Sequence, residues 1–139
     1  MINIENDIYT TVATALRSQF PNIFVAGEYV QAPAAFPAVT LVEADNYVDT
    51  SMSTINIEDA VVVMYNLSVF SNKTSGKKEE AKKISDFADE QMRLLGFTRT
   101  SRTQVPNLAD ATIYRLESRY EAVVGFGNQD NTYIIYQNL

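Results

Sequence analysis

The segment ATIYRLESRYEAVVGF, from Ala111 to Phe126, decides the fold. Its side chains alternate between a mostly apolar set and a mostly charged set. The first set is Thr112, Tyr114, Leu116, Ser118, Tyr120, Ala122 and Val124, and the second is Ile113, Arg115, Glu117, Arg119, Glu121 and Val123. Because successive side chains of a strand point to opposite faces, this alternation predicts an antiparallel strand with one buried face and one face in solvent.

Further strand-like segments surround this one. They are Asn22–Val30, Ala38–Asp45, Ala60–Phe70 and the polar Phe97–Pro106, which suits a sheet edge. The polar segment Asn46–Asp59 has no turn glycine, and we expect either a long loop or the tip of an extended hairpin. The final TYIIYQNL is expected to form a last strand or a docking tail.

Two segments, Glu5–Phe20 and Lys77–Leu95, have the apolar spacing of amphipathic helices. The apolar stripe of the first consists of Ile8, Val12, Ala15, Leu16 and Phe20. The stripe of the second consists of Ala81, Ile84, Phe87, Ala88, Met92 and Leu95. Pro21 is expected to end the first helix and Gly96 the second, and Thr74 or Ser75 is expected to cap the start of the second.

The elements therefore follow the order α-β-β-β-α-β-β. This order predicts an α+β fold, a two-layer sandwich in which both helices pack on one face of a mostly antiparallel sheet. No internal repeat or linker divides the chain, so residues 1–139 are expected to form a single domain, with 125–139 as a candidate docking tail.

Composition excludes several classes of site. The chain has no cysteine and no histidine, which excludes disulfides, thiol catalysis, thiolate zinc sites and histidine general bases. The net charge of −6 argues against a protein that coats duplex nucleic acid. The start MINIENDIY has no basic leader, and no apolar run approaches the length of a membrane span, so we expect neither a signal peptide nor membrane association.

A phosphate-binding loop is suggested by VFSNKTSGKKEEAKK, from Val69 to Lys83, where a strand leads through a glycine and paired lysines into a helix. Gly76 and Lys77 match the second half of a nucleotide-binding loop. However, Ser71 stands where the first glycine is needed, and Lys78 stands where a hydroxyl should hold magnesium. A helix start is the simpler interpretation, and nucleotide binding stays open beside it.

A hydrolase and an RNA-binding protein also stay open as interpretations. Clustered carboxylates suggest a hydrolase, in Glu43 with Asp45, in Glu58 with Asp59, and in Asp86 with Asp89 and Glu90. Eight tyrosines, several of them beside arginines, suggest stacking on RNA bases. No pocket or RNA-binding signature accompanies either pattern, so we expect no catalytic residue, cofactor or metal.

The charged face of the strand-like segment Ala111–Phe126 is a candidate contact surface. Arg115, Glu117, Arg119 and Glu121 alternate in sign and can pair with a neighbouring strand or subunit. A face exposed to solvent explains the same pattern, and both interpretations remain open.

Three stretches carry a family resemblance. They are MINIENDIYTTVATALRSQFPNIFVAGEYVQAPAAFPAVTLVEADN, MYNLSVFSNKTSGKKEEAKKISDFADEQMRLLGFTRT and VPNLADATIYRLESRYEAVV. Together they span about residues 1–124, and they resemble, in this order, the tail terminator (tail completion) proteins of long-tailed phages and prophages. The resemblance lies in the overall pattern and involves no catalytic motif. The segment after Gly125 departs from the pattern.

The resemblance implies a small α/β sandwich that assembles with copies of itself into a ring, a homohexamer. Such a ring caps the tail tube, ends its polymerisation and joins it to the head connector or stopper protein. It implies a virion protein at the head-proximal end of the tail, assembled in the host cytoplasm. A head–tail connector stopper or neck protein is the nearest alternative.

Two sets of residues follow as candidates for this role. DNA passes through such a ring without specific binding, and a carboxylate-lined lumen would repel it; we expect some of Glu43, Asp45, Glu58, Asp59, Asp86, Asp89 and Glu90 to line the lumen. Met52, Ile55 and Ile57 are apolar within the polar Asn46–Asp59 segment and are expected to form a contact arm.

Overall fold

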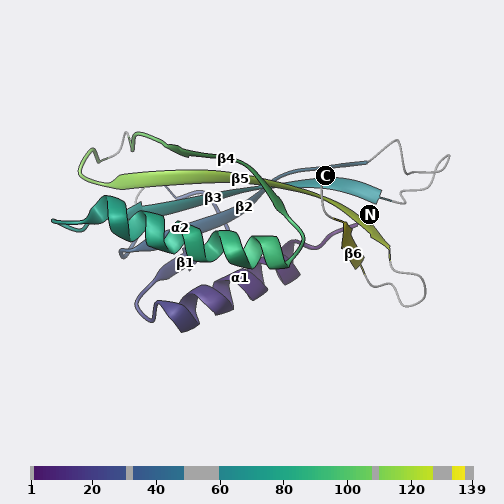
Figure 1. Ribbon diagram of the computed structural model, residues 1–139, viewed down its shortest axis with the longest axis horizontal. Coiled ribbons are helices and arrows are strands. Elements are labelled where there is room, and N and C mark those ends of the chain that lie inside the picture. The colour runs from purple at the N-terminus through teal and green to yellow at the C-terminus, as the bar shows by residue number, and fades with distance from the viewer. Residues whose placement is uncertain (1, 31–32, 49–59, 108–109, 127–132, 137–139) are drawn as a thin grey trace.

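A computed structural model describes residues 2–30, 33–48, 60–107, 110–126 and 133–136. Two helices and six strands occur in these ranges (Figure 1). They are α1 (Glu5–Gln19), β1 (Phe24–Ala26), β2 (Ala38–Val48), β3 (Ala60–Ser71), α2 (Lys77–Leu94), β4 (Thr98–Gln104), β5 (Tyr114–Phe126) and β6 (Tyr133–Tyr136).

The strands form one sheet in the spatial order β1-β2-β3-β5-β4, with β6 also paired to β5. All pairs are antiparallel except β1 with β2. Both helices lie on the same face of the sheet (Figure 1). The α+β sandwich and its element order are therefore confirmed.

Strand β5 shows why the alternation decides the fold. Its apolar set faces the helices and is buried: Tyr114, Leu116, Ser118, Tyr120, Ala122 and Val124. Residues directly opposite on neighbouring antiparallel strands share a face. Val61, Val63, Tyr65, Leu67 and Val69 of β3 therefore lie on this same face, and they join the helices in the main core.

The helices supply the second layer of that core. In α1 the buried residues are Ile8, Val12, Ala13 and Leu16, so Ala13 is buried more deeply than the expected Ala15. In α2 they are Ala81, Ile84, Ser85, Ala88 and Met92. The rings of Phe20 and Phe87 meet edge to face with centroids 5.6 Å apart, which joins the two helices.

The start of α2 differs from the expectation. Its N-cap is Gly76 in the left-handed conformation (φ 83°), and no side chain caps the helix, so the assignment of Thr74 or Ser75 as the cap is wrong. Glycine reaches this backbone conformation without the steric strain of a Cβ atom, and it lets the chain turn directly into the helix. At the other end, Gly96 adopts a positive φ of 97° and ends the helix as expected.

Strands β2 and β3 form a hairpin that is longer than Ala38–Asp45 predicted. Asn46, Tyr47 and Val48 continue β2 and pair with Val63, Val62 and Val61. Of the two structures expected for Asn46–Asp59, the extended hairpin holds for these first three residues. Residues 49–59 lie outside the described part of the chain.

The C-terminal region also pairs with the chain itself. Gly125 and Phe126 belong to β5, and β6 continues the sheet through the register Val123↔Tyr136 to Phe126↔Tyr133. The expectation of a last strand is thus met for residues 133–136. Whether residues 125–139 also dock on another protein stays a prediction.

Candidate assembly surface

The face of the sheet turned away from the helices has no helix layer over it (Figure 1). We call it the open face. Register assigns these residues to it: Thr40, Val42, Asp45 and Tyr47 of β2; Val62, Met64, Asn66, Ser68 and Phe70 of β3; Arg115, Glu117, Arg119, Glu121 and Val123 of β5; and Thr98, Ser101 and Thr103 of β4.

One end of the open face is closed by a small apolar cluster. Ala38, Phe70 and Ile113 are buried there, and Phe24 and Phe36 pack against them. This satellite core was not expected from the sequence, because Ile113 and Phe70 sit at positions that the alternation assigns to the solvent side. The apolar residues at those positions were the available signal.

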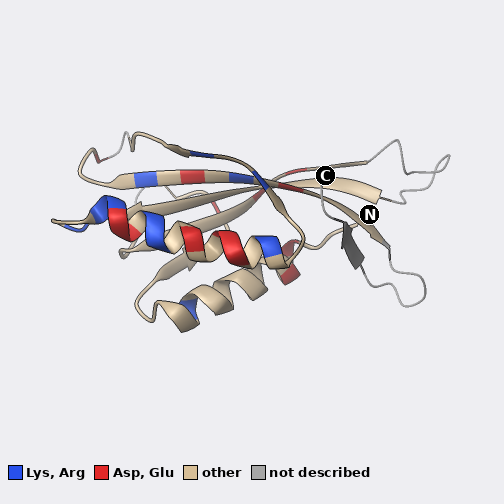
Figure 2. Cartoon of the chain, in the orientation of Figure 1, with Lys and Arg blue, Asp and Glu red and all other residues tan. Residues whose placement is uncertain are grey.

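The charged ladder, Arg115, Glu117, Arg119 and Glu121, runs along the middle of the open face, and Figure 2 shows alternating basic and acidic residues on β5. Glu117 is its centre: its carboxylate lies 3.1 Å from Arg115 Nη2 and 3.6 Å from Arg119 Nε. The side chain of Glu117 is 14% exposed, whereas that of Arg119 is 60% exposed. Glu117 is therefore the mostly buried centre of the ladder, and the Arg119 guanidinium is exposed to solvent.

These ion pairs join neighbours along one strand, and within the described residues the ladder forms no ion pair with another strand, so pairing with another subunit stays a prediction. The reason that no such pair forms is the identity of the cross-strand neighbours. On β3 the ladder faces Phe70, Ser68, Asn66 and Met64, none of which is charged. Arg115 instead lies over the Phe70 ring at 5.4 Å and donates a 3.4 Å hydrogen bond to Ser68 Oγ.

Exposed tyrosines flank the ladder. Tyr29 is 63% exposed, and its hydroxyl accepts a 3.1 Å hydrogen bond from Asn66 Nδ2 in the middle of the open face. Tyr47 is 46% exposed at the end opposite the satellite core, near the half-buried Met64 and Val123. Tyrosine, methionine and arginine are residues enriched in protein interfaces.

Glu43 and Asp45, which were grouped as one carboxylate cluster, lie on opposite faces. A bulge between them shifts the register, so Glu43 pairs with Tyr65 on the helix side and Asp45 pairs with Met64 on the open face. Neither a paired-carboxylate active site nor a common lumen surface is formed by these two residues. Whether either one faces a lumen stays a prediction.

The environment of Glu43 disfavours its ionised form. Burial raises the pKa of its carboxyl, and the neighbouring Glu5 carboxylate at the start of α1 raises it further. Asn46 Nδ2, 3.5 Å away, partly offsets this effect, and it also donates to the carbonyl of Ile2 at 3.0 Å. Across the strand pair, the buried Tyr65 hydroxyl has no hydrogen-bond partner within the described residues.

The three candidate carboxylates of α2 are engaged in ion pairs on the helix surface. Asp86 lies 2.6 Å from Arg102, Asp89 lies 3.7 Å from Arg99, and Glu90 pairs with Arg93 of the same helix. Asp89 also accepts a 2.8 Å hydrogen bond from the buried Tyr120 hydroxyl. Asp86 and Asp89 thus contact β4 and β5 from the surface of α2.

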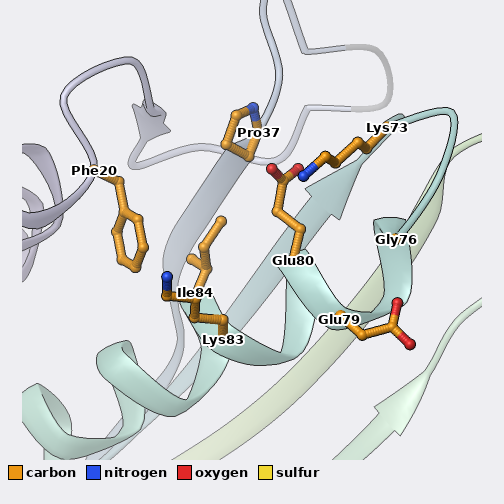
Figure 3. Close-up of a pocket in the computed structure, with 8 residues that line it drawn as sticks. All are labelled: Phe20, Pro37, Lys73, Gly76, Glu79, Glu80, Lys83 and Ile84. Carbon is orange, nitrogen blue, oxygen red and sulfur yellow. The ribbon is translucent and has the colours of Figure 1, made fainter.

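The candidate nucleotide loop lies beside a groove of about 350 Å³ that Figure 3 shows between Phe20, Pro37 and the start of α2. Lys73 and Lys83 line it, but so do Glu79 and Glu80. Ser71 Oγ donates a 2.7 Å hydrogen bond to Glu80, which holds this carboxylate in place. Two carboxylates would repel a phosphate group, so the groove gives no support to nucleotide binding.

The remaining candidates lie beyond the described ranges. Met52, Ile55 and Ile57 of the expected contact arm, and the carboxylates Glu58 and Asp59, fall outside the described residues. Across the ranges that are described, no three acidic side chains come together as metal ligands. Neither α1 nor α2 is long and apolar enough to cross a membrane.

Comparison with known proteins adds no family assignment. The sequence matches no protein-family model and no curated protein.

Proposed function

We propose that this chain is a structural subunit of a phage or prophage tail. Copies of it form a ring, a hexamer, that caps the tail tube, ends its polymerisation and joins it to the head connector. The observation that carries this proposal is the open face, where a half-buried charged ladder and exposed tyrosines are left uncovered by the second layer. Its residues suit contact with other proteins.

Two further observations support the same role. The sequence resembles tail terminator proteins over about residues 1–124, and the resemblance implies a small two-layer sandwich like the one described above. The chain is acidic, with a net charge of −6, so DNA would pass its ring with little adhesion. The tail-tube protein and the head connector or stopper are its proposed partners, and the virion is its proposed location.

The proposal is tested by weakening the open face. Tyr47→Ser combined with Arg119→Ala removes one exposed tyrosine and one exposed guanidinium, which are side chains that often dominate interface energies. We expect the variant to remain folded, because neither side chain is part of the buried core. Tubes of the tail-tube protein should no longer be capped in negative-stain micrographs.

A matched control comes from the helix layer. Leu94→Ser combined with Arg17→Ala removes one exposed apolar and one exposed basic side chain from α2 and α1. This variant should assemble like the unaltered chain. Equal assembly of both variants would contradict a role for the open face.

A further inference from the structure

The two edges of the sheet differ in charge and in how fully they are covered. At one edge, β1 pairs only with Ala38–Thr40 of β2. From Leu41 to Val48, β2 has no strand on that side within the described residues. A groove of about 520 Å³ lies at the start of this stretch, beside Leu41, and is lined by α1, by β1 and by the segment that follows β1. We call it the β2-edge groove.

The β2-edge groove is acidic. Glu5 and Glu28 line it, and Glu43 follows Leu41 on the helix side of β2. No lysine or arginine of the described residues forms an ion pair with any of these three carboxylates. Glu5 and Glu43 repel each other, and no lysine or arginine of the described residues offsets this repulsion.

The opposite edge is β4, an exposed polar strand that carries two arginines. Arg99 and Arg102 point to the helix side, since they pair with the buried Tyr120 and Ser118 of β5. Their present ion-pair partners are Asp89 and Asp86 on the surface of α2. Exposed pairs of this kind contribute little stability, so the arginines can exchange partners at small cost.

The strand pairings place residues of β4 and residues of β2 in the same rows across the sheet, and so at the same height along the strand direction. Arg99 is level with Tyr120, then Tyr65, then Glu43, in one row across β4, β5, β3 and β2. A second row, on the open face, runs from Thr98 through Glu121 and Met64 to Asp45. Rotation about an axis along the strands preserves height. Copies arranged in this way would place Arg99 of one beside Glu43 of the next.

We propose that β4 of one copy adds to the β2-edge groove of the next, so that the sheets of neighbouring subunits continue into one another. This inference rests on the proposed ring and names the surfaces that form it. Strand addition supplies main-chain hydrogen bonds, and the arginines of β4 neutralise Glu5 and Glu43. Because β4 runs antiparallel to β2, the contact extends the antiparallel sheet.

Two features of the edges fit a closed assembly. The contact joins two different surfaces head to tail, and such a contact generates a ring when the rotation closes. Bulges at Ala44 of β2 and Thr100 of β4 interrupt both edges. A bulge bends its strand and increases the local twist, so the two edges meet over a short stretch and the joined sheet curves.

Disulfide cross-linking tests the contact directly, because the chain has no cysteine of its own. Asp45 and Thr98 are both exposed and share a row, so Asp45→Cys with Thr98→Cys places the two thiols at the proposed junction. Opposed strand residues lie at the separation that a disulfide spans. On oxidation, the double variant should give a ladder of covalent oligomers in non-reducing gels.

The single variants and a distant pair serve as controls. Each single variant alone should stay monomeric on the gel, and a mixture of the two should give dimers only. Thr14→Cys with Lys82→Cys, both exposed on the helix layer, should give no ladder. Dimers of one single variant would indicate a two-fold contact and would overturn the inference.

Charge exchange supplies a second, independent measurement. Arg99→Glu should raise the concentration needed for assembly about tenfold, and Glu43→Arg in the same chain should restore it. Rings that persist in Arg99→Glu, with no cross-linked ladder in the cysteine pair, would overturn the edge contact and leave the proposed function standing. A chain that stays monomeric at every concentration, with and without the tail-tube protein, would overturn both.

Discussion

Glu43 shows how the surroundings of one side chain affect the stability of the fold. Burial and the neighbouring Glu5 raise the pKa of its carboxyl above the ordinary value of 4.5. An acid whose pKa is raised by folding stabilises the folded state below its unfolded pKa, and this stabilisation is lost as the pH rises through its folded pKa. At neutral pH the ionised Glu43 therefore destabilises the monomer.

Glu43→Gln should accordingly make the monomer more stable at pH 8, by about 0.5 kcal/mol or less because solvent screens a group this exposed. The gain should vanish below about pH 4.5, where the unfolded carboxyl is protonated as well. Urea unfolding at a series of pH values measures it. Glu79→Gln in the first turn of α2 is the control, and it should lose a little stability at pH 8 because the helix dipole favours a carboxylate there. A gain of stability at pH 8 in both variants would show that the effect does not come from the raised pKa of Glu43.

Gly76 is the second position where one residue sets the local structure. Its φ of 83° is a conformation that other residues adopt with strain, and an added Cβ atom would meet only Glu79 Oε2 at 3.8 Å. Gly76→Ala should therefore cost about 1 kcal/mol through the backbone alone. Gly76→Asn should cost less, because asparagine tolerates this conformation. Equal losses for the two variants in thermal unfolding would contradict this account.

At the scale of the element, α2 separates a buried face from a solvent face. Met92 is fully buried in the main core, whereas Leu94 is 67% exposed. Met92→Ala should destabilise the protein by about 3 kcal/mol, since it leaves a cavity under the helix. Leu94→Ala should change stability by about 0.5 kcal/mol or less. Chemical denaturation of both variants measures the difference in their free energies of unfolding. Similar losses of stability in the two variants would contradict the division of α2 into a buried and an exposed face.

The regular parts of these elements could be predicted from the sequence because periodicity reports burial. The period of two in β5 and the spacing of Ala81, Ile84, Ala88 and Met92 in α2 both reflect one face packed against the other layer. The bulge at Ala44 could not be predicted, since it depends on how β2 and β3 pair. That bulge places Glu43 and Asp45 on opposite faces of the sheet, so the carboxylate pair expected from the sequence is not formed.

The N-cap of α2 was missed for a related reason. Thr74 and Ser75 have the right side chains for a cap, but the chain reaches the helix through a left-handed glycine that makes a side-chain cap unnecessary. Hydroxyl residues near a helix start indicate a cap only when the backbone places them at the N-cap position. The sequence showed the residues and did not show the path of the backbone.

For the whole molecule, the decisive property is that both helices cover one face of the sheet, whereas the other face has no helix layer and is covered only in part, as at the satellite core (Figure 1). A small domain can remain folded with this arrangement, because an antiparallel sheet tolerates solvent on one side. The open face presents exposed tyrosine and arginine side chains, and the two edges of the sheet differ in charge. These features are explained if the chain functions as a subunit within a larger assembly.

The central claim is that the chain closes into rings that cap tail tubes. Native mass spectrometry of the purified chain with tubes of the tail-tube protein, together with electron microscopy of the same sample, tests it most directly. We expect a species of six times the chain mass of 15.6 kDa, and tubes that end in a ring and stop growing. A chain that remains a 15.6 kDa monomer at every concentration, beside tubes that continue to grow, would contradict the claim.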